Sequence, residues 1–381
     1  MKADHPVRKL QQIGQSVWLD NLSRTLIQSG QLKRLIVEEG ITGITSNPTI
    51  FQKAISGSRD YDSSLQGLLK KGIRDPKELF LGLAKEDISQ AADLLLPVYQ
   101  STQGLDGYVS IEVSPDLAYD TEQTIAEAKR LFAEIGKKNV LIKVPATPQG
   151  IPAIERLTGE GVNVNVTLLF AVKRYEAVAE AYLRGLEQRI QKTLPVEGIA
   201  SVASFFVSRV DTMTDKILEA KIASAAADPE KESLRGLRGK AAVANAKAAY
   251  QKFAEIFSGT RFRALKGARI QRILWGSTGT KNPAYSDLKY VEELIGPDSI
   301  NTVPEATLQA LLDHGKVRAT ILDGLEKVQG LFEGLRTKGV EIDKITEDLE
   351  KEGVKLFADS FTLLLKEISQ KRDSMLAGQH Q

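Results

Sequence analysis

The sequence has no cysteine and only three histidines among its 381 residues. The lack of cysteine excludes disulfides, thiolate nucleophiles, and zinc or iron–sulfur sites built on sulfur. His5 and His380 lie close to the chain ends, and only His314 is internal. A histidine-based catalytic triad and a multi-histidine metal site are therefore not expected, and we predict chemistry that needs no metal.

Long apolar runs and an excess of one charge are also missing. No stretch of about 18 apolar residues occurs, and residues 1–6 lack the apolar core of a signal peptide, so we expect a cytoplasmic protein without a membrane span. The 51 basic and 49 acidic residues nearly cancel and form no long block. Neither nucleic acid nor an anionic membrane is an expected partner, whereas a small anionic substrate needs only two or three placed cations.

Eight β-rich runs alternate with segments of helical periodicity, which predicts an α/β protein. The runs are residues 10–13 and 17–20 taken together, which end at Asp20, then 40–48, 108–113, 139–145, 161–167, 199–207, 272–277 and 298–303. The helical segments are 21–40, two or three helices within 51–103, then 121–135, 150–157, 169–186, 211–268 and 308–376.

This alternation favours one (β/α)8 TIM barrel over the whole chain, 1–381, because no Gly/Pro/Ser-rich linker divides it. Helical insertions are expected near 52–104 and 212–268, with C-terminal helices at 308–376. A doubly wound open sheet is the alternative, since alternation alone does not show that the sheet closes.

One lysine, Lys143, lies near the end of the apolar, β-branched run 139–147. If this run is a buried strand, desolvation disfavours the charged amine and leaves a larger share of the free amine. The free amine is the nucleophile of Schiff-base chemistry. The alternative is a strand-end lysine whose ammonium reaches water.

Side-chain alternation places further polar groups on the face that carries Lys143. In the strands around it the β-branched residues share one face, which suits packing on helices, while Glu112, Asn165 and Thr167 share the other. A carboxylate such as Glu112 is rarely buried unless it is paired or used, and its structural alternative is an ion pair with Lys143.

The same alternation adds three polar residues at or near strand ends: Asp20, Asn47 and Ser204. Asp20 or Asn47 could instead cap a helix or form a turn, and Ser204 could fill a tight core.

Two cationic residues are candidates for binding a phosphate. Lys281 ends a glycine-rich segment, 276–281, that offers backbone donors but lacks the Walker and dinucleotide patterns. Arg209 comes shortly after the strand 199–207 and is the second candidate. Alternatively, it begins the solvent-exposed face of the next helix.

Together these motifs resemble the transaldolase family, in particular its larger bacterial members. The similarity runs through nearly every strand, in the segments 18–20, 45–49, 110–113, 142–146, 165–170 and 204–209. The family fold is a (β/α)8 barrel of the class I aldolase type with its lysine on the fourth strand. The resemblance thus implies that Lys143 attacks the keto group of a ketose phosphate.

The other candidate residues take their roles from the same resemblance. Glu112 and Thr167 would hold the water that shuttles protons, and Asp20 would remove the proton from the hydroxyl whose carbon–carbon bond breaks. The remaining assignments are to substrate binding: Asn47, Asn165 and Ser204 for the dihydroxyacetone unit, and Arg209 and Lys281 for the phosphate. Many members of the family have a second phosphate-binding arginine, and Lys281 is the residue nearest to that position. A lysine supplies positive charge but cannot form the two parallel hydrogen bonds that an arginine makes to a phosphate.

The implied activity is transfer of a dihydroxyacetone unit in the non-oxidative pentose phosphate pathway. The donor would be sedoheptulose 7-phosphate or fructose 6-phosphate, and the acceptor glyceraldehyde 3-phosphate or erythrose 4-phosphate. No cofactor is expected, because the protonated imine is itself the electron sink. The alternatives are a fructose 6-phosphate aldolase that releases free dihydroxyacetone and a non-catalytic barrel that binds sugar phosphates. The protein is expected to be a monomer or homodimer.

Overall fold

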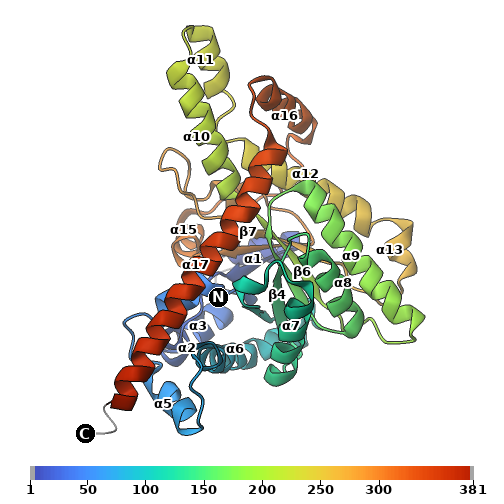
Figure 1. Ribbon diagram of the computed structural model, residues 1–381. Helices are drawn as coiled ribbons and strands as arrows, with labels where there is room; N and C mark the ends of the chain where they lie inside the picture. Colours follow the sequence, from blue (N-terminus) through green and yellow to red (C-terminus); the bar gives the residue numbers. More distant parts are fainter. Residues whose placement is uncertain (1–4, 378–381) are drawn as a thin grey trace.

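Eight parallel strands follow one another around a closed barrel, and β8 pairs with β1 to complete it (Figure 1). The structure, a computed structural model, describes residues 5–377. The strands are β1 (Gln15–Leu19), β2 (Gly43–Ile44), β3 (Tyr108–Glu112), β4 (Val140–Pro145), β5 (Val164–Leu169), β6 (Ser201–Phe206), β7 (Arg272–Gly276) and β8 (Ser299–Val303). The (β/α)8 prediction is confirmed, and the open-sheet alternative is wrong.

Helices occupy the connections between strands. Those before β6 are α1 (Pro6–Ile13), α2 (Arg24–Gln28), α3 (Gln31–Val37), α4 (Pro48–Ile55), α5 (Asp62–Lys70), α6 (Pro76–Ser101), α7 (Thr121–Ile135), α8 (Gly150–Glu160) and α9 (Val172–Gln191), with the 3-10 turn η1 (Pro115–Leu117). After β6 follow α10 (Ser208–Ser224), α11 (Asp228–Arg235), α12 (Ala241–Phe257), α13 (Thr260–Ala264), α14 (Lys289–Glu292), α15 (Glu305–His314), η2 (Leu325–Lys327), α16 (Val328–Thr337) and α17 (Ile342–Ala377). The treatment of 52–104 and 212–268 as insertions in one domain remains a prediction.

Residues 10–13 lie in a helix and not in the first strand, so that part of the prediction is wrong. Pro6 occupies the first turn of α1, where its missing N–H costs nothing, and Gly14 ends the helix at φ +93°. Val7 and Leu10 are buried on one side of this helix. Leu10 and Ile13 are three residues apart with two glutamines between them, which is helical spacing and not a strand-like run.

Three other predicted boundaries differ from the structure. The segment 21–40 is broken into α2 and α3 at Gly30, whose φ of +77° interrupts a helix. β2 is only two residues long, because Asn47 already caps α4. Residues 315–324 form no helix between α15 and η2. In each case a turn or a cap ends the element before its hydrophobic pattern ends.

The strand side chains divide between two separate apolar cores, as alternation predicts. The outer core lies between barrel and helices and contains the valines and isoleucines of β3, β4 and β5. The inner core fills the barrel with Trp18, Tyr108, Leu141, Val202, Leu274 and Ile300, packed with Tyr99 and Ala200. Lys143 lies two residues beyond Leu141 on the same face of β4, and therefore stands directly above this apolar layer.

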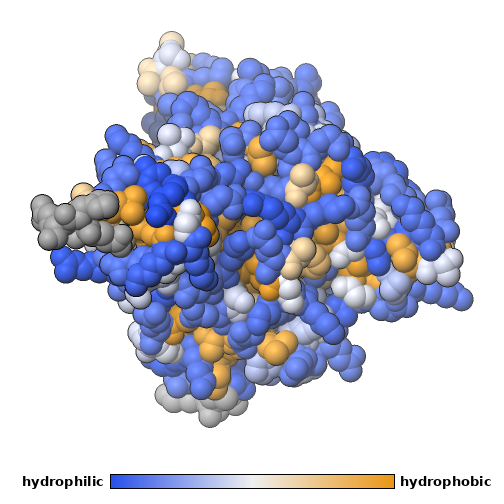
Figure 2. Space-filling model, turned by 60° about the horizontal axis from the view of Figure 1, so that its bottom comes forward, coloured by the Kyte–Doolittle hydropathy of each residue, from blue (hydrophilic) through white to orange (hydrophobic). Residues whose placement is uncertain are grey.

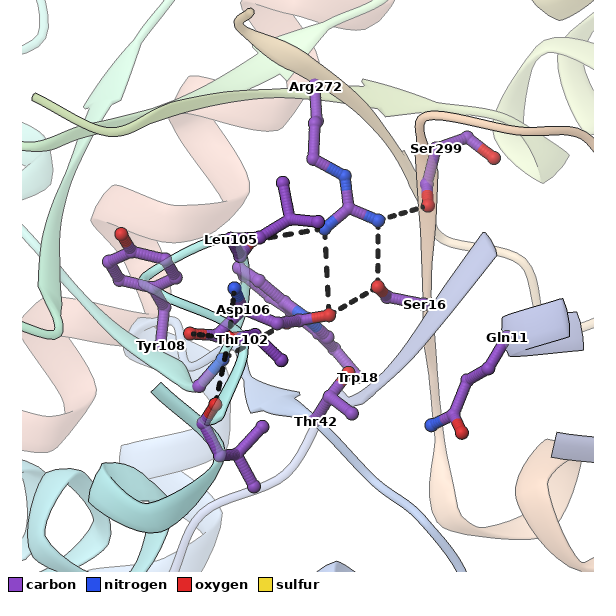
Figure 3. Close-up of polar contacts among 12 residues, drawn as sticks. Gln11, Ser16, Trp18, Thr42, Thr102, Leu105, Asp106, Tyr108, Arg272 and Ser299 are labelled. Carbon is purple, nitrogen blue, oxygen red and sulfur yellow. Dashed lines mark hydrogen bonds and ion pairs between the residues drawn. The ribbon is translucent and has the colours of Figure 1, made fainter. Parts of the chain in front are cut away.

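A buried polar network closes the amino-terminal end of the barrel (Figure 3). Arg272 Nη2 donates to Ser16 Oγ at 2.7 Å and to the Ser299 carbonyl at 2.8 Å, and Nη1 lies 3.6 Å from the Asp106 carboxylate. Trp18 Nε1 donates to Asp106 Oδ1 at 2.6 Å. The guanidinium and the carboxylate thus occupy this end of the barrel. The pocket that Lys143 lines is at the opposite end, where the strands have their carboxyl ends.

The long helix α17 passes diagonally across the molecule, between the projecting α10–α11 and α16 on one side and α5 on the other (Figure 1). It contacts α4, α6 and β5. Gly353 permits a close approach, because a Cβ at this position would lie 2.8 Å from Leu168 Cδ2 of β5. The C-terminal helix is thus packed onto the strand that carries Asn165 and Thr167.

The face shown in Figure 2 carries mostly hydrophilic side chains, with its apolar residues in small separate groups. None of the helices within residues 5–377 has the length and apolar content needed to cross a membrane.

We predict that Gly43→Ala destabilises the fold. Gly43 pairs with Trp18 across β1 and β2, and an added Cβ would lie 2.4 Å from the indole ring. Overpacking of this kind costs about 1–3 kcal/mol in the free energy of unfolding, measurable by urea denaturation. The control is Gly67→Ala in α5, where nothing lies within 4 Å of the new methyl group and a gain of roughly 0.5–1 kcal/mol is expected. Equal unfolding free energies for the two variants would contradict the prediction.

Candidate active site

Strand register brings the central candidate residues side by side. Glu112 of β3 is the register partner of Lys143 on β4, and Lys143 is the partner of Asn165 on β5. Thr167 pairs with Pro145, two residues further along the same strands. Three consecutive parallel strands therefore place these side chains on one face at the carboxyl end of the barrel, as predicted.

The Lys143 side chain is buried, with only 4% of the residue exposed. Its Nζ donates to the Ser46 carbonyl at 3.0 Å and lies 3.4 Å from Glu112 Oε2. The Ser46 hydroxyl in turn donates to the Ser110 carbonyl at 2.7 Å, which fixes the β2–α4 connection against β3. The amine is thus held over the inner core and still lines the open pocket above it.

Glu112 is a buried acid whose ionisation is opposed by its surroundings. Burial raises its pKa, the nearby Lys143 ammonium partly offsets this, and the Asp20 carboxylate adds to the rise. Both carboxyl oxygens are buried and accept no hydrogen bond from residues 5–377, although Oε2 forms the ion pair with Lys143. Both the structural ion pair and a proton-holding role are therefore compatible with this geometry.

A small cavity beside Glu112 is distinct from the pocket above Lys143. Its volume is about 10 Å³, and its walls include Ser114 and three phenylalanines. This is about the space that one water needs. The Thr167 hydroxyl is likewise buried without a hydrogen-bond partner in the described part of the chain. Neither Thr167 nor Lys143 lines this cavity, so Glu112 and Asn47 are the candidate residues that border it.

Asp20 directly follows β1 and is half-buried at the pocket wall. Thr45 Oγ1 donates to Asp20 Oδ1 at 2.7 Å and lies 2.7 Å from Thr302 Oγ1. Burial raises the pKa of Asp20, while the Thr45 hydrogen bond and the ammonium groups of Lys143 and Lys281 act in the opposite direction. A carboxyl held in this way can accept a proton and return it.

The three neutral polar candidates occupy different positions. Ser204 and Asn47 line the pocket. Asn47 Oδ1 also accepts from the Ile50 N–H at 3.0 Å, so the helix-cap alternative is correct for this residue as well. Asn165 is fully buried, donates to Ser110 Oγ at 2.9 Å and accepts from Ser204 Oγ at 2.7 Å. Asn165 therefore orients Ser204.

The pocket above Lys143 has a volume of about 330 Å³ and a basic lining. Its charged side chains are one carboxyl, Asp20, and four basic groups: Lys53, Lys143, Arg209 and Lys281. Arg209 is half-buried over the Phe206 ring, with 5.9 Å between Cζ and the ring centroid, and burial lowers its pKa. Arg209 thus faces the pocket and does not begin a solvated helix face.

Lys53 and the pocket residues of α17 are not among the predicted site residues. Lys53 lies in α4, in a segment treated only as a helical insertion, although it follows Asn47 by six residues. Leu356 and Phe357 of α17 line the same pocket from a distant part of the chain, and no local motif indicates this. Within residues 5–377 no group of three or more His, Asp or Glu side chains is placed to hold a metal ion.

The fold and the site together define the class of protein. A (β/α)8 barrel with a buried lysine, neighbouring acids and a basic pocket at the carboxyl ends of its strands is an enzyme of the class I aldolase type.

Comparison with known proteins gives the family. Residues 17–368 match the family Transaldolase/Fructose-6-phosphate aldolase, and the chain belongs to it. It is 46% identical to a transaldolase of Trichodesmium erythraeum over 95% of this chain and 96% of the relative. Identity is 46% to transaldolase 2 of Nostoc sp., over the same shares of the two chains. A transaldolase of Saccharopolyspora erythraea is 45% identical over 98% of this chain and 99% of its own length.

We predict that Asp20→Asn stabilises the protein at neutral pH. Because the pKa of Asp20 is raised on folding, stability falls as pH rises from the ordinary aspartate range, near 3.8, through the raised value. The variant does not ionise and escapes this loss, while its amide oxygen can still accept from Thr45. In urea denaturation, its free energy of unfolding should exceed that of the unmodified protein at pH 7, and the difference should vanish below the ordinary pKa of an aspartate.

Asp116→Asn provides the control, since it removes the same charge from an exposed residue that does not line this pocket. An advantage of Asp20→Asn that does not change between low and neutral pH would contradict the assigned cause.

Proposed function

We propose that the protein is a transaldolase. It transfers a dihydroxyacetone unit from sedoheptulose 7-phosphate or fructose 6-phosphate to glyceraldehyde 3-phosphate or erythrose 4-phosphate, a reaction of the non-oxidative pentose phosphate pathway. The observation that carries the proposal is the buried Lys143, which lines a basic pocket and lies 3.4 Å from the carboxyl group of Glu112. Family membership over nearly the whole chain supports it.

In the first stage Lys143 forms the imine. Its neutral amine attacks the keto carbon at C2 of the donor, giving a carbinolamine. Glu112, whose raised pKa favours the protonated acid, supplies a proton to the C2 hydroxyl, which leaves as water. Thr167 helps to hold the water that carries protons between the carboxyl and the reacting carbon. The product is a protonated imine, which withdraws electrons from C3.

In the second stage Asp20 breaks and remakes the carbon–carbon bond. Its carboxylate removes the proton from the C4 hydroxyl, the C3–C4 bond breaks, and its electron pair enters the imine to form an enamine. The aldose phosphate then leaves. When the acceptor aldehyde binds, the enamine attacks its carbonyl carbon and Asp20 returns the proton. Hydrolysis of the new imine frees the product and restores the Lys143 amine.

The remaining pocket residues bind the substrate. Asn47 and Ser204 hydrogen-bond the dihydroxyacetone hydroxyls, and Asn165 orients Ser204. Arg209 and Lys281 bind the phosphate from the β6 and β7 side of the pocket. Neither forms a hydrogen bond or ion pair with another residue in the range 5–377, so both are available to an anion. The cytoplasmic location and the monomeric or homodimeric state remain predictions.

The position of α17 at the entrance of the pocket supports transfer of the dihydroxyacetone unit rather than its release to water. Leu356 and Phe357 of α17 border the pocket above Lys143, where they limit the access of water to the enamine. Product analysis distinguishes the two reactions. A transaldolase forms little free dihydroxyacetone without an acceptor and a new ketose phosphate when the acceptor is added. Rapid release of dihydroxyacetone in both assays would identify an aldolase instead.

The Schiff base can be trapped directly. Borohydride treatment in the presence of fructose 6-phosphate should attach the three-carbon unit to Lys143, as located by peptide mass analysis. Lys143→Ala should show no label and lose more than about a thousandfold in kcat. Lys281→Ala should keep the label at saturating donor, since it weakens only phosphate binding. A label on another lysine, or none in the unmodified protein, would overturn the proposal.

The role of Asp20 can be separated from that of the lysine. Asp20→Asn should still form the trapped adduct with fructose 6-phosphate but lose roughly 10²–10⁴-fold in kcat, because imine formation does not need this carboxyl and bond cleavage does. Single-turnover trapping measures the first step, and the coupled assay with acceptor measures the second. If adduct formation and turnover fall by the same factor, Asp20 does not act in the cleavage step.

A further inference from the structure

Lys53 projects from the face of α4 that borders the pocket. The pocket is lined by Thr49, Ile50 and Lys53, which share one side of the helix by their i, i+3 and i+4 spacing. The contact of α4 with α17 adjoins this side: Thr49 Oγ1 lies 2.9 Å from Ser360 Oγ, and Gln52 Nε2 and Ser56 Oγ donate to Glu367 Oε1 at 3.2 and 3.1 Å. The helix is therefore fixed, and Lys53 points to the mouth.

Lys53 does not pair with the carboxylate of Glu367, although its sequence neighbours Gln52 and Ser56 both donate to that group. Glu367 receives hydrogen bonds from residues on both sides of Lys53 in the sequence, and its Oε2 is buried with no partner among residues 5–377. Lys53 nevertheless forms no ion pair with it or with any other residue in that range. The exposed ammonium thus remains available to an anion in the pocket.

The order of strands places Lys53 across the barrel from the other phosphate cations. Lys53 follows β2, Arg209 follows β6, and Lys281 follows β7. In a closed ring of eight strands in sequence order, β2 lies opposite β6, and β4 with Lys143 lies midway between them. The reacting amine therefore has a cationic group on either side of it, in one continuous pocket of about 330 Å³.

We propose that Lys53 is a second phosphate-binding position and that the pocket binds ketose bisphosphates in competition with the monophosphate donor. This inference rests on the proposed function, which places C2 of the sugar at Lys143 and its distal phosphate at Arg209 and Lys281. The C1 end then points toward α4, because Asn47 of the same connection binds the dihydroxyacetone unit. A phosphate on C1 meets Lys53, whose ammonium supplies a charge-assisted hydrogen bond.

Direct binding tests the proposal without requiring turnover. Isothermal titration calorimetry would compare fructose 1,6-bisphosphate with fructose 6-phosphate on the unmodified protein, Lys53→Ala and Lys53→Arg. For Lys53→Ala we expect about tenfold weaker binding of the bisphosphate and less than about a twofold change for the monophosphate. Lys53→Arg should keep the bisphosphate affinity, because it retains the charge.

The control variant is Lys71→Ala, which removes an exposed lysine at the end of α5, outside this pocket, and should change neither affinity. Equal weakening of both sugars by Lys53→Ala would overturn the proposal, since Lys53 would then act only through the general field of the pocket. Unchanged bisphosphate affinity, or no competition between the two sugars, would also overturn it. Failure of the proposed function would be recognised separately, by the absence of a borohydride-trapped adduct.

Discussion

The structure depends on holding one amine and one carboxyl group away from water, side by side, inside a barrel. Lys143 and Glu112 are both more than nine-tenths buried and stand 3.4 Å apart. A buried pair of this kind offsets part of its desolvation cost by mutual attraction, whereas either group alone would be strongly unfavourable. The layer of apolar side chains below the pair and the closed amino-terminal end of the barrel keep it dry from beneath. All reactivity is therefore directed to the carboxyl end.

The two ends of the barrel use buried charge for opposite purposes. At the amino-terminal end, the Arg272 guanidinium pairs with Asp106 and donates to the Ser299 carbonyl, so that its charge is used inside the barrel (Figure 3). At the carboxyl end the pocket has more basic than acidic groups. Arg209 remains unpaired within the described chain. Such an excess of positive charge is favourable only when an anionic ligand enters, which is the reason that the pocket suits sugar phosphates.

Much of the site could be predicted because its central residues lie on consecutive strands. The alternation of side chains in β3, β4 and β5 determines that Glu112, Lys143, Asn165 and Thr167 share a face, and the structure confirms this. The helix boundaries were harder, since residues 10–13 formed a helix through a proline and a glycine and not a strand. The resemblance to the transaldolases supplied the chemical roles, which alternation alone could not assign. Lys53 was missed because a helical lysine carries no local signal of the pocket it faces.

The sequence alone narrowed the chemistry: a chain without cysteine and with isolated histidines offers neither a thiolate nor a histidine triad, and a lysine in an apolar strand is its candidate nucleophile. It also predicted the alternation of strands and helices, because strand and helix periods are local properties of the chain, whereas closure of the sheet is not. Only the tertiary structure decided that Asn165 orients Ser204, that α17 borders the pocket and that Lys53 lies opposite Arg209. These relations join residues far apart in the sequence, and their geometry depends on ring closure and helix packing, which no local pattern encodes.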